Sequence, residues 1–194
     1  TKEWAKAAGD ESRWQDYWQK QCRAYYFMGK DNIPFHTVIW PAMLLGYGGL
    51  NLPYDVPANE YLQVDGLKAS TSRNWAVWLP DYLDKYEPDP LRYVLAANMP
   101  ETSDSDFSWR NYVRLNNDEL VATYGNLVHR VLTMSYRDFD GKIPQPADLD
   151  DDANGLLEEA DRRFDEAGAS IEACRFRTAL GVAMALAREA NRYI

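Results

Sequence analysis

Hydrophobic residues in the first half of the chain form short runs that turn residues separate. Aromatic residues recur at helix-like spacings in residues 1–21, where Gly9-Asp10 predicts a break between two helical pieces. The apolar run 23–28 predicts a buried strand that ends in the tight turn 29–32. A strand followed by such a turn favours an open α/β sheet, in which ligands bind beyond the carboxyl ends of the strands.

The hydrophobic residues after the turn first follow a helical spacing and then, further along the chain, alternate with polar residues as in a strand. The apolar segment 35–46 predicts a helix that Pro41 kinks, and the Gly- and Pro-rich segment 46–57 predicts a loop. Alternating apolar and polar residues predict a strand at 61–64, and Asp65-Gly66 is a strong hairpin signal.

Residues 67–72 form the return segment of this hairpin. Arg73-Asn74 then predicts the start of a helix. A short helix is expected at 91–98, and the Ser- and Asp-rich residues 102–106 predict a polar loop.

The second half of the chain has the longer period of helices. Residues 117–137 predict one long helix, and 148–168 an acidic helix with Asp150 to Asp152 at its N-terminus. Ser170 is the expected N-cap of a last helix at 171–194. The apolar stripe expected on the long helix is formed by Leu120, Tyr124, Leu127, Val128 and Val131. The fold class that follows is α/β followed by all-α.

Composition narrows the class of protein. The 194 residues are 46% hydrophobic and 26% charged, which is typical of a soluble globular protein. The net charge of −9 argues against nonspecific nucleic-acid binding, although it allows a specific RNA contact through a local basic face. Cys22 and Cys174 match no metal or redox spacing, so two reduced thiols in a cytoplasmic protein are expected. No apolar run is long enough to span a bilayer, so no membrane partner is expected.

The segment Lys68-Ala69-Ser70-Thr71-Ser72 carries the first candidate chemistry. A lysine, hydroxyl groups and backbone N–H groups in one compact loop can bind a polyphosphate. The same composition is also common in ordinary turns. Asp31, in the turn 29–32, can accept hydrogen bonds from ribose hydroxyls, or it can cap a helix. His36 is either a site residue or a histidine packed in the core.

Asn126 and Arg130 are four residues apart on the long helix. At about 100° per residue, both are expected on the side opposite the apolar stripe. An amide and a planar guanidinium on a polar helix face can recognise unpaired bases. A solvated face without function is the alternative.

Three stretches of this chain resemble the methionyl-tRNA synthetase family of class I aminoacyl-tRNA synthetases. The first is Tyr25-Tyr26-Phe27-Met28-Gly29-Lys30-Asp31-Asn32-Ile33-Pro34-Phe35-His36-Thr37, continued by Trp40-Pro41-Ala42-Met43-Leu44. The second is Lys68-Ala69-Ser70-Thr71-Ser72-Arg73, the counterpart of the class I signature Lys-Met-Ser-Lys-Ser. The third is Asn126-Leu127-Val128-His129-Arg130-Val131-Leu132.

The resemblance implies the following organisation. Residues 1–106 would be the C-terminal part of a Rossmann-like catalytic domain, and 107–194 an α-helical anticodon-binding domain that stops short of its C-terminus. The enzyme would activate methionine with ATP and Mg²⁺ and transfer it to tRNA(Met).

The resemblance also implies roles for single residues. Those implied to act in catalysis are Lys68, Ser70, Thr71 and Ser72. Those implied to bind ATP are Gly29, Asp31, Lys68 and Thr71. Asn32, His36 and Trp40 are implied to border the methionine pocket, and Asn126 and Arg130 to read the anticodon. No metal ligand is expected within this sequence.

The sequence departs from the family pattern in three respects. Thr71 replaces the second lysine of the signature, and we expect Lys68 to compensate. The N-terminal half, with its His-Ile-Gly-His signature and the region in which zinc can sit, is expected in the rest of a longer parent protein. No Trp follows Trp109, whereas the family stacks an anticodon base on a late Trp.

We therefore expect the parent protein to be an enzyme and these 194 residues alone to be inactive. Two other functions stay open from the residues. One is a non-catalytic RNA-binding helical module with a degenerate nucleotide fold. The other is a different class I synthetase, for leucine, isoleucine, valine or cysteine. The half of a sheet that lacks partner strands is expected to expose apolar surface.

Overall fold

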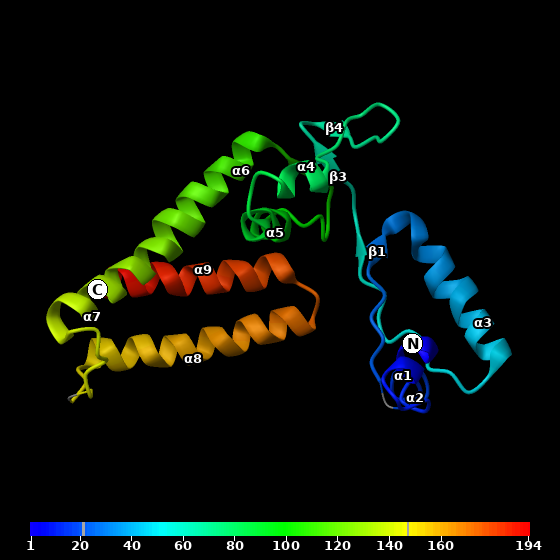
Figure 1. Cartoon of the computed structure of the whole chain (residues 1–194), viewed down its shortest axis with the longest axis horizontal. Coiled ribbons are helices and arrows are strands. Elements are labelled where there is room, and N and C mark those ends of the chain that lie inside the picture. The colour runs from blue at the N-terminus through cyan, green and yellow to red at the C-terminus, as the bar shows by residue number, and fades with distance from the viewer. Residues whose placement is uncertain (21, 147) are drawn as a thin grey trace. The chain divides into compact units, whose positions relative to one another are not determined.

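The computed structural model describes residues 1–20, 22–146 and 148–194 (Figure 1). The chain forms two compact units. Unit 1 comprises Thr1–Tyr61 together with Pro100–Asp104, and unit 2 comprises Leu62–Met99 together with Ser105–Ile194.

Unit 1 begins with two short helices, α1 (Lys2–Ala7) and α2 (Gln15–Trp18). Gly9, with φ of +79°, lies between them in a conformation that glycine adopts without steric cost. The break predicted at Gly9-Asp10 is confirmed. The fully buried Ala5 lies on the packed side of α1.

The sheet of unit 1 pairs β1 (Met28–Gly29) in parallel with β2 (Ala58–Asn59). The prediction of a buried strand over 23–28 is wrong in extent and in burial. Upstream of Met28 the segment is extended and forms one isolated bridge, Tyr25 to Asp55, and the side chain of Phe27 is 53% exposed. Within the described residues this sheet has two strands, so no second neighbour covers the run.

The polar turn and the helix that follow β1 have three hydrogen-bond patterns. The turn is the 3₁₀ helix η1 (Lys30–Asn32), and it leads into the π-helix η2 (Phe35–Ile39) and then into α3 (Trp40–Tyr47). Pro41 has no N–H to donate to the carbonyl of Thr37, as an α-helix would require. Pro41 lies in the first turn of α3, directly after the π-helical segment, and the kink predicted there stays a prediction.

Unit 2 contains a three-stranded sheet in the order β4-β3-β5. The antiparallel hairpin of β3 (Leu62–Val64) and β4 (Leu67–Lys68) turns at Asp65 and Gly66, whose φ angles are 49° and 74°. Positive φ at both turn residues is the geometry that Asp-Gly favours, and the predicted hairpin is confirmed.

The loop predicted at 102–106 is wrong at its end. β5 (Ser105–Phe107) pairs in parallel with β3, and the backbone N–H of Gly66 donates to Asp106 Oδ1 at 2.7 Å. Phe107 is buried, so this short segment forms a strand because it closes one edge of the sheet over the core. Because Ser105 and Asp106 are polar, the sequence predicted a loop here and not a strand.

The main core of unit 2 lies between the sheet and the helices α4 (Leu79–Leu83) and α5 (Pro88–Ala97). Val94 is fully buried at its centre. The other buried members are Tyr82, Leu91, Phe107 and Leu115. The short helix predicted at 91–98 is present and begins three residues earlier, with Pro88 in its first turn.

A continuous helical segment follows, made of α6 (Trp109–Leu115), the π-helix η3 (Asn116–Gly125) and α7 (Asn126–Phe139). The apolar stripe predicted on it is wrong in part, because Tyr124, Val128 and Val131 are exposed. Each π-type i→i+5 turn holds more residues than an α-turn. A projection at 100° per residue therefore points to the wrong side beyond η3.

Two long helices complete unit 2, α8 (Asp151–Glu172) and α9 (Phe176–Tyr193), which lie side by side (Figure 1). The cap predicted at the start of α8 is confirmed, since Asp150 Oδ1 accepts from the N–H of Ala153 at 2.8 Å. The N-cap predicted at Ser170 is wrong. Ser170 lies inside α8, and the turn comes at Cys174, whose φ is +56°.

Among the described residues, no helix combines the length and the apolar character that crossing a membrane requires.

Candidate functional site

The first group of candidate residues surrounds η1 in unit 1. Asp31 is exposed, and its Oδ1 accepts a hydrogen bond of 2.6 Å from the hydroxyl of Tyr61. This hydrogen bond raises the pKa of Tyr61, because it would be lost on ionisation and because the phenolate would lie beside a carboxylate. Tyr61 thereby orients the carboxyl group of Asp31.

Lys30 supports the same arrangement from the other side of Tyr61. Its Nζ lies 4.4 Å from the centre of the Tyr61 ring and 3.8 Å from Asp104 Oδ1, and it is paired with Glu60. The hydrogen bond to Glu60 is the main cause of the raised pKa of Lys30. The ring of Tyr61 is therefore fixed at its hydroxyl by Asp31 and at its face by Lys30.

The second group is centred on Tyr26. Trp40 Nε1 donates to the hydroxyl of Tyr26 at 3.1 Å, and the rings of Tyr26 and His36 are 5.9 Å apart. His36 Nδ1 lies 3.1 Å from the main-chain oxygen of Asn32. Two of the residues predicted for a methionine pocket, His36 and Trp40, thus lie beside Tyr26, and Asn32 contacts His36 through its main-chain oxygen.

The third group is the lysine–hydroxyl loop of unit 2, which follows β4. Ser70 and Trp75 exchange two backbone hydrogen bonds of 2.8 and 2.9 Å and close a four-residue turn over 71–74. The hydroxyl oxygens of Ser70 and Ser72 are 3.2 Å apart, and an Nη of Arg73 donates to the carbonyl of Lys68 at 3.4 Å. Lysine and hydroxyl groups therefore lie within one short loop.

The helix start predicted at Arg73-Asn74 is wrong. Asn74 has φ of +52°, which lies outside the helical region, and its Oδ1 accepts from Trp78 Nε1 at 2.9 Å. Trp75 Nε1 donates to the carbonyl of Val64 at 2.8 Å. Trp75 thus anchors the loop to the hairpin, Trp78 bonds to the loop residue Asn74, and the helix begins only at Leu79.

The fourth group is the pair Asn126 and Arg130 on α7. We expected both on a polar helix face opposite the apolar stripe. The structure corrects this expectation, because Arg130 is half-buried and both side chains donate to Asn191 of α9, each at 2.9 Å. Asn126 remains exposed. The contacts with α9 decide which face of α7 is covered.

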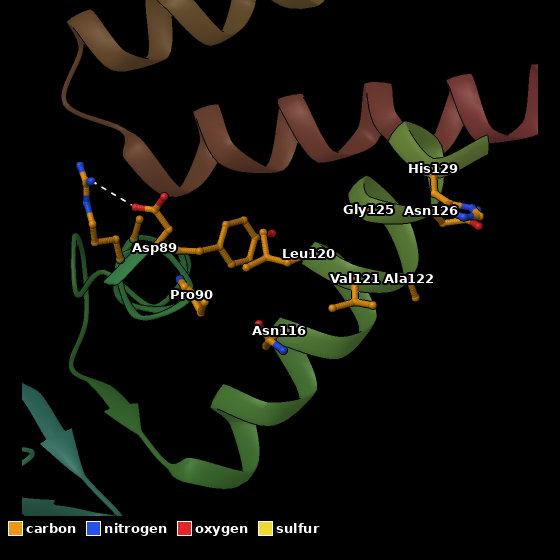
Figure 2. Close-up of a pocket in the computed structure, with 12 residues that line it drawn as sticks. Asp89, Pro90, Asn116, Leu120, Val121, Ala122, Gly125, Asn126 and His129 are labelled. Atoms are coloured by element: carbon orange, nitrogen blue, oxygen red, sulfur yellow. Dashed lines mark hydrogen bonds and ion pairs between the residues drawn. The ribbon is translucent and has the colours of Figure 1, made fainter. Parts of the chain in front are cut away.

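An open groove of about 1420 Å³ runs along η3 and α5 in unit 2. Figure 2 shows Asp89 and Pro90 on α5, Leu120 and Val121 on η3, and Asn126 beside His129 at one end of the groove. The exposed surface of the groove is largely apolar, and its polar lining residues are Asp89, Arg92, Tyr93, Asn116, Asn126 and His129.

Three residues of these groups were not anticipated as site residues from the sequence, namely Tyr26, Tyr61 and Asn191. Tyr26 is one of several aromatic residues before Gly29, and only the position of Trp40 distinguishes it. Tyr61 and Asn191 are far in sequence from their partners Asp31 and Asn126, at separations of 30 and 65 residues. No local pattern signals contacts of that kind.

Within the described residues, no group of three or more His, Cys, Asp and Glu side chains is placed to hold a metal ion.

Comparison with known proteins agrees with the resemblance seen in the sequence. Residues 1–132 match the family described as tRNA synthetases class I (M). Methionine–tRNA ligase of Dehalococcoides mccartyi is 57% identical over 192 residues, which is 99% of this chain and 35% of that protein. Methionine–tRNA ligase of Pyrococcus furiosus is 46% identical over 205 residues, covering 100% of this chain and 28% of its own length.

The structure of Mycobacterium tuberculosis methionyl-tRNA synthetase bound by methionyl-adenylate superposes with a TM-score of 0.81 at 28% identity. The match covers 88% of this chain and 33% of that one. This chain therefore spans about a third of the length of its relatives.

A mixed α/β part that carries a lysine–hydroxyl loop, followed by a helical part, has the fold of a class I aminoacyl-tRNA synthetase. More particularly, the chain belongs to the methionine branch of that class, the tRNA synthetases class I (M). The resemblance stated from the sequence is confirmed.

Proposed function

We propose that this chain is part of a methionine–tRNA ligase, which activates methionine with ATP and transfers it to tRNA(Met). The observation that carries the proposal is 57% identity across 99% of the chain to a methionine–tRNA ligase, a span that includes all four groups of candidate residues. The complete enzyme's activity belongs to a protein of which this chain covers a third.

In the first step, a carboxylate oxygen of methionine attacks the α-phosphorus of ATP. The bond from that phosphorus to the bridging oxygen breaks, and methionyl-adenylate and pyrophosphate form. Negative charge grows on the leaving pyrophosphate, and Lys68 with the hydroxyls of Ser70, Thr71 and Ser72 stabilises that charge. Mg²⁺ accompanies ATP and neutralises part of the phosphate charge.

Two further residues are assigned to nucleotide binding. We propose that Asp31, oriented by Tyr61, accepts hydrogen bonds from the ribose hydroxyls, and that Gly29 lets the nucleoside approach the main chain.

Methionine binding is assigned to Asn32, His36 and Trp40. The rings of His36 and Trp40 beside Tyr26 offer an apolar wall with a few polar groups, which suits a thioether side chain. In the second step, a ribose hydroxyl of the tRNA 3′ end attacks the carbonyl carbon of methionyl-adenylate, and AMP leaves. Asn126 and Arg130 would hold the same tRNA at its anticodon.

We further propose that residues 1–106 belong to a Rossmann-like catalytic domain and 107–194 to an α-helical anticodon-binding domain. Parallel pairing of β1 with β2 supports the first assignment, and the bundle of α7, α8 and α9 supports the second.

The test is amino-acid-dependent ATP–pyrophosphate exchange by the full-length synthetase, with methionine, leucine, isoleucine, valine and cysteine in turn. We expect exchange with methionine alone. His36→Ala should raise the KM for methionine about tenfold, the cost of one or two lost contacts. His129→Ala, at the other histidine of the chain, should leave that KM unchanged. Exchange driven by another of these amino acids would refute the proposal.

A further inference from the structure

Asn191 lies in the last turn of α9, and its side-chain amide is hydrogen-bonded on both sides. Its Nδ2 donates to the main-chain oxygens of Thr123 at 2.8 Å and of Ala187 at 3.0 Å. Its Oδ1 accepts from Asn126 Nδ2 at 2.9 Å. A carboxamide has two N–H donors and one oxygen, so both donors of Asn191 are in use.

This arrangement determines which way both amides face. The oxygen and nitrogen of an asparagine are normally hard to tell apart, and their assignment depends on the partners. Main-chain oxygens only accept, so the nitrogen of Asn191 must face Thr123 and Ala187. Its oxygen must then face Asn126, which is obliged to turn its own nitrogen toward α9. Asn126 consequently presents its oxygen and one N–H to the outside.

Asn191 also fixes Arg130, through its main chain. The carbonyl oxygens in the last turn of a helix have no partner within the helix, and a cation there is favoured by the helix dipole. Arg130 Nη1 donates to the carbonyl of Asn191 at 2.9 Å. This bond uses one of the five N–H donors of the guanidinium.

We propose that Asn191 is a positioning residue for anticodon recognition. It sets the amide of Asn126 so that this amide offers one acceptor and one donor to a base edge, and it holds Arg130 beside it. An unpaired base whose edge carries a donor next to an acceptor is the matching ligand. The inference rests on the proposed function, in which Asn126 and Arg130 contact the anticodon.

The test uses the full-length synthetase and an RNA hairpin with the anticodon loop of tRNA(Met). Asn191→Ala removes the side-chain contacts, and Asn191→Leu keeps the shape of the side chain without its hydrogen bonds. We expect both to weaken hairpin binding about tenfold and to reduce discrimination against single-base variants of the anticodon. Methionine-dependent ATP–pyrophosphate exchange, which needs no tRNA, should keep its KM and kcat.

A double-mutant cycle separates positioning from general stability. In an Asn126→Ala background, Asn191→Leu should have much less effect on binding and none on base discrimination. Arg192→Ala is the matched control on the same turn, since Arg192 is exposed and paired with Glu189 at 3.0 Å. It should bind as the parent enzyme does, and circular dichroism will show whether each variant keeps its helices.

Two results would overturn the inference while leaving the proposed function intact. One is wild-type binding and discrimination in Asn191→Leu, and the other is full additivity of Asn191→Leu with Asn126→Ala. If Asn126→Ala and Arg130→Ala themselves leave hairpin binding unchanged, the proposed anticodon contact fails, and the role of Asn191 fails with it.

Discussion

At the scale of single residues, two of the candidate polar side chains are held by partners that are distant in sequence. Asp31 is oriented by Tyr61, and Asn126 by Asn191. Candidate residues such as Asp31 and Lys68 were found from local motifs, because their neighbours in sequence carry the pattern. Their supporting residues were missed, because a tyrosine or an asparagine 30 or 65 residues away carries no mark of its partner.

Replacing Tyr61 with Phe tests the support of Asp31. The variant keeps the ring over Lys30 and loses the hydrogen bond to the carboxylate. This hydrogen bond is exposed to solvent, which weakens its effect, so we expect the KM for ATP to rise severalfold. The KM for methionine should not change. Tyr47→Phe, at an exposed tyrosine, is the control, and an unchanged KM for ATP in Tyr61→Phe would disprove the support.

In the usual signature two lysines stabilise the negative charge of the phosphates. Because the second lysine is replaced by the uncharged Thr71, we expect Lys68 to stabilise this charge alone. Removing one preorganised donor costs about 2.7–4 kcal/mol, so Lys68→Ala in the full-length enzyme should slow adenylate formation about 10²- to 10³-fold. Pre-steady-state quench-flow measures that step. Lys85→Ala provides a matched exposed lysine outside the loop, and a near-normal rate for Lys68→Ala would show that the loop works without it.

At the scale of elements, the sequence predicted correctly the hairpin, which depends on the residues of its own turn. It did not predict the faces of α7 or the strand β5, which depend on packing against distant parts of the chain. The hairpin at Asp65-Gly66 followed from two residues, since both must adopt positive φ. The faces of α7 did not follow from its sequence, because the π-helix η3 lies before it and is stabilised by packing against α9. β5 was missed for a similar reason, as Ser105 and Asp106 are strand residues only in the presence of β3.

The core under this sheet predicts a dependence on alkaline pH. Tyr82 is buried, and burial together with the hydrogen bond to Tyr112 raises its pKa above the usual value of about 10. A raised pKa in the folded state means that the folded chain holds this proton more tightly than the unfolded chain. The protonated hydroxyl of Tyr82 therefore contributes its full stabilisation of the fold below pH of about 10, and this stabilisation is lost as pH rises beyond that value.

Urea unfolding of the 194-residue chain, followed by circular dichroism from pH 7 to pH 11, measures this loss. Tyr82→Phe should be less stable at pH 7 by about 1 kcal/mol, because hydrogen bonds to Tyr112 and to the carbonyl of Glu87 disappear. Its stability should fall less steeply above pH of about 10. Tyr86→Phe, at an exposed site, should behave as the parent chain. Equal slopes for Tyr82→Phe and the parent chain would contradict the assignment.

At the scale of the whole molecule, the chain has surfaces that a complete protein would rarely leave open. Phe35, Val38 and Met43 on η2 and α3 are more than half exposed, as was expected for half of a sheet domain. The relatives extend over about three times the length of this chain. We propose that other parts of the synthetase cover this apolar surface, and that the isolated chain associates with itself through it.

The most direct test of the central claim is methionine-dependent ATP–pyrophosphate exchange. It is measured on the 194-residue chain alone and on the same chain mixed with a separately prepared N-terminal part of the synthetase. We predict no exchange by the chain alone and exchange by the mixture, abolished when the chain carries Lys68→Ala. Exchange by the chain alone would contradict its role as one part of a shared site. No exchange in the mixture, with anticodon hairpin binding retained, would instead indicate a non-catalytic RNA-binding module.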